Sequence, residues 1–202
     1  KIIAGAGRRA RCRQPPLRLY VTLDSSSVTR RVVKQLAALG ARAIVDKGNR
    51  VFFEAEDAAR FEVLQGVERL CLCLFDVDLG PDAPLFAHHP ADWSVLEGWF
   101  ESADMQQAAG CWKAICGRPP ASWALNARRR GEACRKCIDQ QELLTRARAC
   151  VQRHWPSLSP VRYSAGEECE DLPDLAVQLQ LSASGACAGV PLLRPSAPGA
   201  AA

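Results

Sequence analysis

The sequence predicts an α+β fold, in which a ferredoxin-like N-terminal half is followed by a second α/β domain. Two observations lead to this prediction. Between residues 17 and 76, apolar patterns follow the order strand, helix, strand, strand, helix, strand, which is the split β-α-β arrangement. Residues 175–181 then alternate apolar and polar side chains with a period of two, which is typical of a strand with one buried face.

The first elements of the N-terminal half, 17–76, follow from periodicity. Alternating apolar residues predict a strand at 17–23, and apolar residues at helical spacing from Val28 to Leu39 predict a helix. Two short strand patterns follow, separated by Lys-Gly-Asn, a composition typical of hairpin turns. We therefore expect a strand, a helix and a two-stranded hairpin in this order.

A short helix and a buried strand complete this half. Asp57 can cap the helix, on which Phe61 and Leu64 are apolar. Residues 70–75 form an uninterrupted apolar run, which is expected of a strand buried on both faces.

Residues 77–120 are predicted to be a linker with a tryptophan-rich helix. Asp92 can open this helix, and Trp93 shares one helical face with Phe100. We expect the tryptophans of this segment to bury against the N-terminal sheet. A break at Gly-Arg-Pro-Pro marks the boundary of the next domain, 121–194.

The domain 121–194 begins with a strand pattern at 122–127. Asp139 can cap an amphipathic helix. The alternating strand 175–181 is followed by a turn and a last strand at 186–193. This order again predicts helices packed on a sheet.

The ends of the sequence differ from its middle. Residues 1–16 predict a flexible basic leader, and residues 195–202 predict a low-complexity tail. No apolar run approaches the roughly 20 residues that cross a bilayer, so we expect no membrane partner. Ten cysteines without an export signal are typical of reduced thiols, which predicts a nuclear or cytoplasmic location.

The net charge of +4 is mild, but the charges are segregated. Residues 1–50 carry 12 basic and 2 acidic side chains, whereas residues 51–112 carry 2 and 12. Residues 113–162 are basic again, with 11 against 3. A basic block can face phosphates, although such charge is more often a solvated surface.

Four segments of the second domain together resemble the THUMP domain, an RNA-binding module. They are Arg128–Gly131, Gln141–Leu144, Asp174–Leu179 and Gly189–Leu192. In that family a strand with a basic exit precedes a helix, and an Asp introduces a strand that leads to a Gly-hydrophobic-Pro strand. The resemblance implies that this domain grips RNA.

The N-terminal half is similar to the part that accompanies THUMP in RNA guanosine N2-methyltransferases. The matching stretches are Leu19–Thr22, Gly48–Phe53 and Val67–Leu70. The resemblance implies an S-adenosylmethionine-dependent enzyme that acts on transfer RNA or spliceosomal small nuclear RNA. A small zinc-containing activator protein is implied only for the full-length relative.

The catalytic motifs of such enzymes are not found in this sequence. Binding of the methyl donor requires a glycine-rich turn after a strand, and the family places an Asp/Asn-Pro-Pro-aromatic motif at the guanine amine. Arg118–Ala121 has the two prolines but neither the acidic start nor the aromatic end. We therefore expect no catalytic residues and no cofactor in this chain.

RNA binding is expected from a dense group of basic side chains, because guanidinium groups clamp phosphate oxygens and release counterions. These residues are Arg128, Arg129, Arg130, Arg135, Lys136 and Arg146. The alternative is that they are solvated or pair with the acidic residues between 167 and 171.

Two other classes of function stay open. The alternating charge blocks are also compatible with a protein-interaction module that has no RNA role. Cys134 and Cys137 have the spacing of zinc ligands, but a structural zinc site needs about four ligands. We expect plain thiols and no metal.

Overall fold

The computed structural model describes residues 15–79, 92–161 and 173–192. Almost all of the predicted leader 1–16, and all of the predicted tail 195–202, lie outside these ranges. The strands are β1 (Leu17–Leu23), β2 (Arg42–Asp46), β3 (Arg50–Ala55), β4 (Val67–Asp78), β5 (Ser122–Arg130), β6 (Ser159–Pro160), β7 (Leu175–Ser182) and β8 (Gly185–Pro191). The helices are α1 (Thr29–Ala38), α3 (Trp93–Ser102), α4 (Met105–Cys116), α5 (Glu132–Cys137) and α6 (Gln140–His154), with 3-10 turns η1 (Ser26–Val28) and η2 (Ala59–Phe61).

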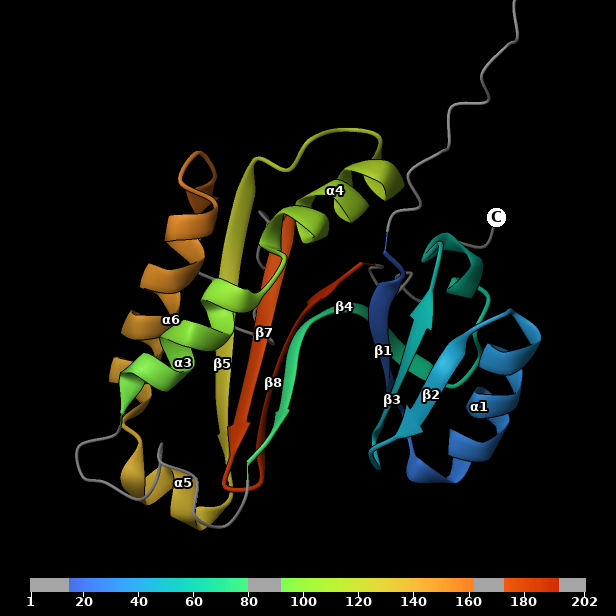
Figure 1. The fold of residues 1–202 in the computed structure, drawn as a ribbon, viewed down its shortest axis with the longest axis horizontal. Coiled ribbons are helices and arrows are strands. Elements are labelled where there is room, and N and C mark those ends of the chain that lie inside the picture. The colour runs from blue at the N-terminus through green and yellow to red at the C-terminus, as the bar shows by residue number, and fades with distance from the viewer. Residues whose placement is uncertain (1–14, 80–91, 162–172, 193–202) are drawn as a thin grey trace, which may run out of the picture.

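All described strands belong to one mixed sheet, in the order β2-β3-β1-β4-β8-β7-β5-β6 (Figure 1). The pairs that involve β1, β2, β3, β4 and β8 are antiparallel, whereas β5 runs parallel to both β6 and β7. The predicted α+β class is therefore confirmed. The assignment of the N-terminal half to the ferredoxin-like class, and the domain boundaries, stay predictions.

Strand β4 joins the two halves of the sheet. Leu72 pairs with Leu19 of β1 on one side and with Val190 of β8 on the other. The register with β8 shifts between Cys73 and Phe75, which is the position of a bulge. Bulges bend a strand and increase its twist, so β4 changes direction where it passes from one half to the other.

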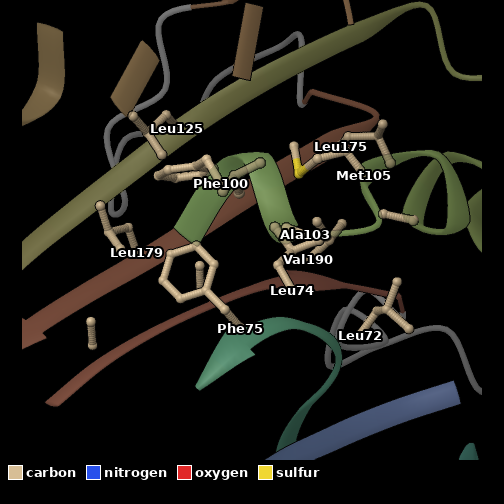
Figure 2. Packing of buried hydrophobic residues seen from close by; sticks show 14 of the residues in the cluster. Leu72, Leu74, Phe75, Phe100, Ala103, Met105, Leu125, Leu175, Leu179 and Val190 are labelled. Atoms are coloured by element: carbon tan, nitrogen blue, oxygen red, sulfur yellow. The ribbon is translucent and has the colours of Figure 1, made fainter. Parts of the chain in front are cut away.

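The described helices cover one face of this sheet. Figure 2 shows Phe100, Ala103 and Met105, at the junction of α3 and α4, packed against Phe75 of β4 and Leu125 of β5. The same cluster continues through Leu72 and Val190 to the side chains of β1 and α1. In Figure 1, α3 and α6 lie outside β5, and α1 lies beside β2 and β3.

Aspartate caps begin three of the helices. The side chains of Asp92, Asp104 and Asp139 each accept a hydrogen bond from a backbone amide two or three residues further on, at 2.8–3.0 Å. Such a cap stabilises a helix by roughly 1 kcal/mol. The predicted caps of Asp92 and Asp139 are thus confirmed. Helix α4 ends at Cys116 and is followed by Gly117, whose φ of 72° is accessible to glycine at little cost.

Several elements differ from those that the sequence predicted. The second helix of the N-terminal half is only the 3-10 turn η2, although Asp57 does accept a hydrogen bond from the Ala59 amide at 3.0 Å. Strand β5 does not end at residue 127 but continues to Arg130. Because Arg128, Arg129 and Arg130 therefore belong to the strand, their side chains alternate between the two faces of the sheet. Among the described helices, none has the length and apolar character needed to cross a membrane.

The tryptophans of the predicted linker lie in or beside the core. Trp93 and Trp112 are buried, and Trp99 packs against Phe75 with 5.9 Å between ring centroids. Trp123 and Trp155, which lie outside that segment, are buried as well. Burial of these large side chains fixes the positions of α3, α4 and α6 on the sheet.

Candidate nucleic-acid interface

The face of the sheet opposite the helices carries a polar hollow with a volume of about 120 Å³. Its lining comes from both halves of the chain: Thr22, Asn49, Arg50, Glu68, Arg69, Asn126, Arg128, Arg130, Gln178, Leu179 and Gln180. We refer to this feature as the polar hollow. All but one of its lining side chains are polar or charged, so it is built to contact a polar ligand.

The alternation of side chains along two parallel strands forms one wall of the polar hollow. Asn126 and Arg128 of β5 stand beside Gln178 and Gln180 of β7, in register. Intervening residues such as Leu125 point to the opposite face, into the core beneath α3 and α6. The amphipathic pattern that buries one face of β5 and β7 therefore places amides and guanidinium groups on the other.

The opposite wall comes from the N-terminal half. Thr22 of β1 pairs with Arg50 of β3 and with Arg69 of β4. Arg50 Nη2 donates a hydrogen bond to Gln180 Oε1, at 2.6 Å. Because β1, β4 and β8 separate β3 from β7 in the sheet, this contact requires a strongly curved sheet. The curvature closes the polar hollow on one side.

Tyr20 lies behind Arg50 on the same face and is 1% exposed. The Arg50 guanidinium stands over its ring, 5.4 Å from the centroid. A Cβ atom at Gly189 would lie 2.5 Å from Tyr20 Cε1, so only glycine allows this ring to lie so close to β8. Burial raises the pKa of the Tyr20 hydroxyl, which keeps it protonated.

The electrostatics of the polar hollow favour anions. Four arginines line it, against the single carboxylate of Glu68, which lies 3.7 Å from Arg69. Arg128 and Arg130 form no ion pair with any residue that the structure describes. Guanidinium groups bind phosphate oxygens through paired N–H donors, so the hollow can accept a phosphate chain.

Two buried polar atoms of the polar hollow lack a hydrogen-bond partner. They are Thr22 Oγ1 and Arg50 Nε, and neither contacts an acceptor or donor within the described ranges. Buried polar groups without a partner are uncommon and costly, by roughly 1–3 kcal/mol each. Because neither atom is accessible from outside, this cost falls on the fold, and the two atoms offer no contact to a bound ligand.

Arg129 lies on the other face of β5, away from the polar hollow. Its Nε donates a hydrogen bond to Gln140 Oε1 at 2.8 Å, and its Nη1 donates to the carbonyls of Arg135, at 3.3 Å, and Ile138. These contacts fasten β5 to the end of α5. The sequence grouped Arg129 with Arg128 and Arg130, but a strand directs alternate side chains to opposite faces, so Arg129 is turned away from the other two.

The remaining predicted residues lie on the helices. Lys136 pairs with Glu132 one helical turn away, at 2.7 Å, and Arg146 lies 3.7 Å from both Glu97 and Glu142. Arg135 is exposed on α5. None of these three lines the polar hollow. The acidic residues between 167 and 171, proposed as alternative partners, lie outside the described residues.

Sequence reasoning missed half of the polar hollow. Arg50 and Arg69 come from the N-terminal half, and their approach to β7 depends on sheet curvature that no local pattern reports. Gln178 and Gln180 were recognisable as the polar face of an alternating strand. That signal identified the exposed face but not its function.

The possible zinc pair has no further ligands among the described residues. Cys134 is buried and its thiol donates to the Leu181 carbonyl at 3.6 Å. Within 15–79, 92–161 and 173–192, no group of three or more metal-binding side chains is present. Cys169 lies outside these ranges.

Comparison with solved structures shows that parts of larger proteins share this fold. The chain is similar to TrmN from Thermus thermophilus, with a TM-score of 0.58 and 20% identity over 88% of this chain and 46% of that one. SMU.472, a putative methyltransferase complexed with SAH, is similar with a TM-score of 0.56 and 13% identity, over 88% of this chain and 42% of that one. A predicted N6-adenine-specific DNA methylase from Listeria monocytogenes is similar with a TM-score of 0.55 and 11% identity, over 87% of this chain and 40% of that one.

These similarities show a shared fold. The chain spans less than half the length of each of the three proteins. No protein-family model matches the sequence, and no curated protein matches it either. The activity of a longer protein is therefore a matter for proposal.

Proposed function

We propose that this chain is the RNA-binding portion of an S-adenosylmethionine-dependent RNA guanosine N2-methyltransferase, with transfer RNA or small nuclear RNA as its substrate. In this proposal, residues 121–194 act as a THUMP-like domain and residues 17–76 as a ferredoxin-like half. The methyl-transfer domain belongs to a longer protein, which acts in the nucleus or the cytoplasm with its zinc-containing activator.

The polar hollow is the observation that supports this proposal. Arg128 and Arg130 project into it without carboxylate partners in the described ranges, next to Arg50 and the amides of β7. Arginines supply backbone affinity, while amide side chains can hydrogen-bond to sugars and base edges. A site that combines both fits RNA better than it fits an acidic protein surface, which offers no base edges.

The polar hollow does not fit the methyl donor. S-adenosylmethionine carries a positive sulfonium, which the four arginines would repel, because the single carboxylate of Glu68 offsets only one of their charges. The described residues therefore suggest no step that passes through this cofactor. The shared fold with methyltransferase structures supports the link to methyl transfer.

RNA affinity measured against salt concentration tests the proposal. Fluorescence anisotropy would use a labelled RNA hairpin with a free single-stranded 3′ end, and the Arg128→Gln/Arg130→Gln double variant. Each lost phosphate contact lowers the slope of log K against log salt by roughly 1, so we expect a slope lower by about 2. Affinity should fall at least tenfold at low salt.

A charge-matched variant provides the control. Arg30 and Arg31 are exposed on α1 and do not line the polar hollow. Arg30→Gln/Arg31→Gln removes the same charge and should leave the slope almost unchanged. Equal losses of RNA affinity in the two double variants would show that the effect comes from net charge and not from the polar hollow. Wild-type protein that shows no salt-dependent RNA binding would instead favour the protein-interaction module.

A further inference from the structure

Gln180 connects the two walls of the polar hollow. Its Oε1 accepts a 2.6 Å hydrogen bond from Arg50 Nη2. Gln180 also stands beside Arg128, because the two residues are partners in the register of β5 and β7. All three side chains line the polar hollow. Neighbouring strands lie about 4.8 Å apart, so Gln180 has one guanidinium bound to it and a second on the adjacent strand.

The hydrogen bond to Arg50 sets the orientation of the Gln180 carboxamide. A guanidinium has only N–H donors, whereas a carboxamide has a donor NH2 group and an acceptor oxygen. The oxygen must therefore face Arg50, and the NH2 group faces away from it. Gln180 Nε2 is not buried and forms no hydrogen bond to a described residue. It is thus available to donate a hydrogen bond to a ligand.

Arg50 is held in place but keeps a free donor. Its guanidinium stands 5.4 Å from the centroid of the Tyr20 ring, and Tyr20 is packed in the core at 1% exposure. Nη1 of Arg50 is not buried and forms no hydrogen bond within the described ranges. It can therefore donate to a ligand in the polar hollow. Because the fold fixes the guanidinium in advance, binding would cost little side-chain entropy.

The three side chains offer hydrogen-bond donors and no free acceptor. Arg128 forms no ion pair with a described residue, and the acceptor of Gln180 is already occupied by Arg50. The single carboxylate of the polar hollow, Glu68, lies beside Arg69 instead. A ligand that satisfies such a group must supply several acceptor oxygens and negative charge. A phosphate group supplies both.

We propose that Arg50, Gln180 and Arg128 form a subsite for one phosphate group, in which Gln180 is a positioning residue. Its carboxamide oxygen holds Arg50, while its Nε2 and the two guanidinium groups donate to the phosphate oxygens. The proposal rests on the proposed function for the source of the phosphate, which is then the RNA backbone. Because Arg50 and Gln180 come from opposite halves of the chain, both halves build the subsite.

The salt dependence of RNA binding separates a positioning residue from a direct contact. Gln180→Met changes no charge, so loss of a direct neutral contact alone would lower the RNA affinity and leave the slope of log K against log salt unchanged. Release of Arg50 from its position removes a phosphate contact as well. We therefore expect the slope to decrease by about 1.

Gln178→Met is the matched control for Gln180→Met. Gln178 lies on the same strand and the same face, and it lines the polar hollow. It forms no hydrogen bond to a described arginine. Its replacement removes an amide of the same size without releasing a guanidinium group, so the slope should equal that of wild type.

Gln180→Glu distinguishes loss of the subsite from loss of the fold. The glutamate keeps an acceptor for Arg50, so the urea concentration at half-unfolding should not fall below the wild-type value. It replaces the donor NH2 group with a carboxylate, which repels phosphate. RNA affinity should therefore fall at least as far as in Gln180→Met.

Inorganic phosphate tests the subsite without RNA. At equal ionic strength, phosphate should raise the melting temperature of the wild-type chain more than chloride does, and Gln180→Met should lose this difference. If phosphate has this effect but the wild-type chain binds no RNA, the proposed function is wrong and the subsite stands. The subsite is wrong if Gln180→Met keeps both the wild-type slope and the wild-type response to phosphate.

Discussion

Arg50 and Gln180 form a 2.6 Å hydrogen bond across the curved face of the sheet, although they come from opposite halves of the chain. The guanidinium also stands over Tyr20, so it is held from two directions. This contact fixes the distance between the two walls of the polar hollow. The shape of the candidate site therefore depends on a bond between the halves as well as on each half.

The energetic coupling of Arg50 and Gln180 is measurable by a double-mutant cycle. We expect Arg50→Met and Gln180→Met to be coupled by about 1 kcal/mol in chemical denaturation, because each variant alone leaves a part-buried polar group without its partner. Arg60 is exposed, and Arg60→Met combined with Gln180→Met serves as the uncoupled control. Additive effects in the Arg50–Gln180 cycle would show that the contact does not fasten the halves.

Substitutions of the neighbours Arg129 and Arg128 should have different effects, the first on the stability of the fold and the second on RNA binding. Arg129→Gln removes hydrogen bonds to a side chain and two carbonyls, so we expect it to lower the free energy of unfolding by about 1–3 kcal/mol. Arg128→Gln should change stability by less than about 0.5 kcal/mol, because the residue is exposed, and should weaken RNA binding. Urea unfolding and RNA titration of both variants check the contrast.

Asp174 should make stability depend on pH in the acid range. Burial disfavours its ionised form, but hydrogen bonds from the Ala121 amide and from Arg118 outweigh burial and lower the pKa of the carboxyl. A lowered pKa means that ionised Asp174 stabilises the fold above about pH 4, its ordinary pKa, and that this contribution is lost as pH falls further. The Asp174→Asn variant should be less stable than wild type at pH 7. Its free energy of unfolding should also fall less steeply as the pH is lowered.

Urea unfolding between pH 7 and pH 3 measures this effect. Arg118 is 59% exposed, so solvent screens its share, and we expect a total loss of about 1 kcal/mol at pH 7. Asp139→Asn is a suitable control, because Asp139 caps α6 with no ion pair to a described residue. An Asp174→Asn variant with the same acid slope as wild type would contradict the assignment.

Gly189 should not accept a side chain. A Cβ atom there would lie 2.5 Å from Tyr20 Cε1 and 2.7 Å from the Leu72 carbonyl oxygen, and the backbone cannot move away without disrupting β4. We expect Gly189→Ala to cost about 1–3 kcal/mol in thermal or denaturant unfolding. Gly98→Ala in α3 meets nothing within 4 Å and should raise stability by up to about 1 kcal/mol.

Local patterns were sufficient to place most elements. The alternation at 175–181 corresponds to β7, and the cap at Asp139 begins α6 as expected. These features depend on neighbouring residues alone, so the sequence reports them directly. The prediction of a second helix in the N-terminal half was wrong. The segment after Asp57 is too short for more than a 3-10 turn, because Gly66, with a φ of 78°, reverses the chain soon after it.

The candidate site was harder to predict because it depends on tertiary geometry. The face on which Arg129 lies depends on where β5 ends, because only a strand residue has a defined face. The ends of strands are weakly specified by the sequence. The contact of Arg50 with Gln180 requires a curved sheet, and this curvature leaves no clear trace in residue types. Charge segregation indicated a basic surface but not which arginines converge.

The position of β8 has a consequence for how the protein is made. It lies between β4 and β7 in the middle of the sheet, yet it is the last strand of the described chain to leave the ribosome. Until Gly185–Pro191 emerges, β4 and β7 each keep an open edge, and such edges promote association between chains. Insertion of β8 between these two strands therefore covers both open edges in one step.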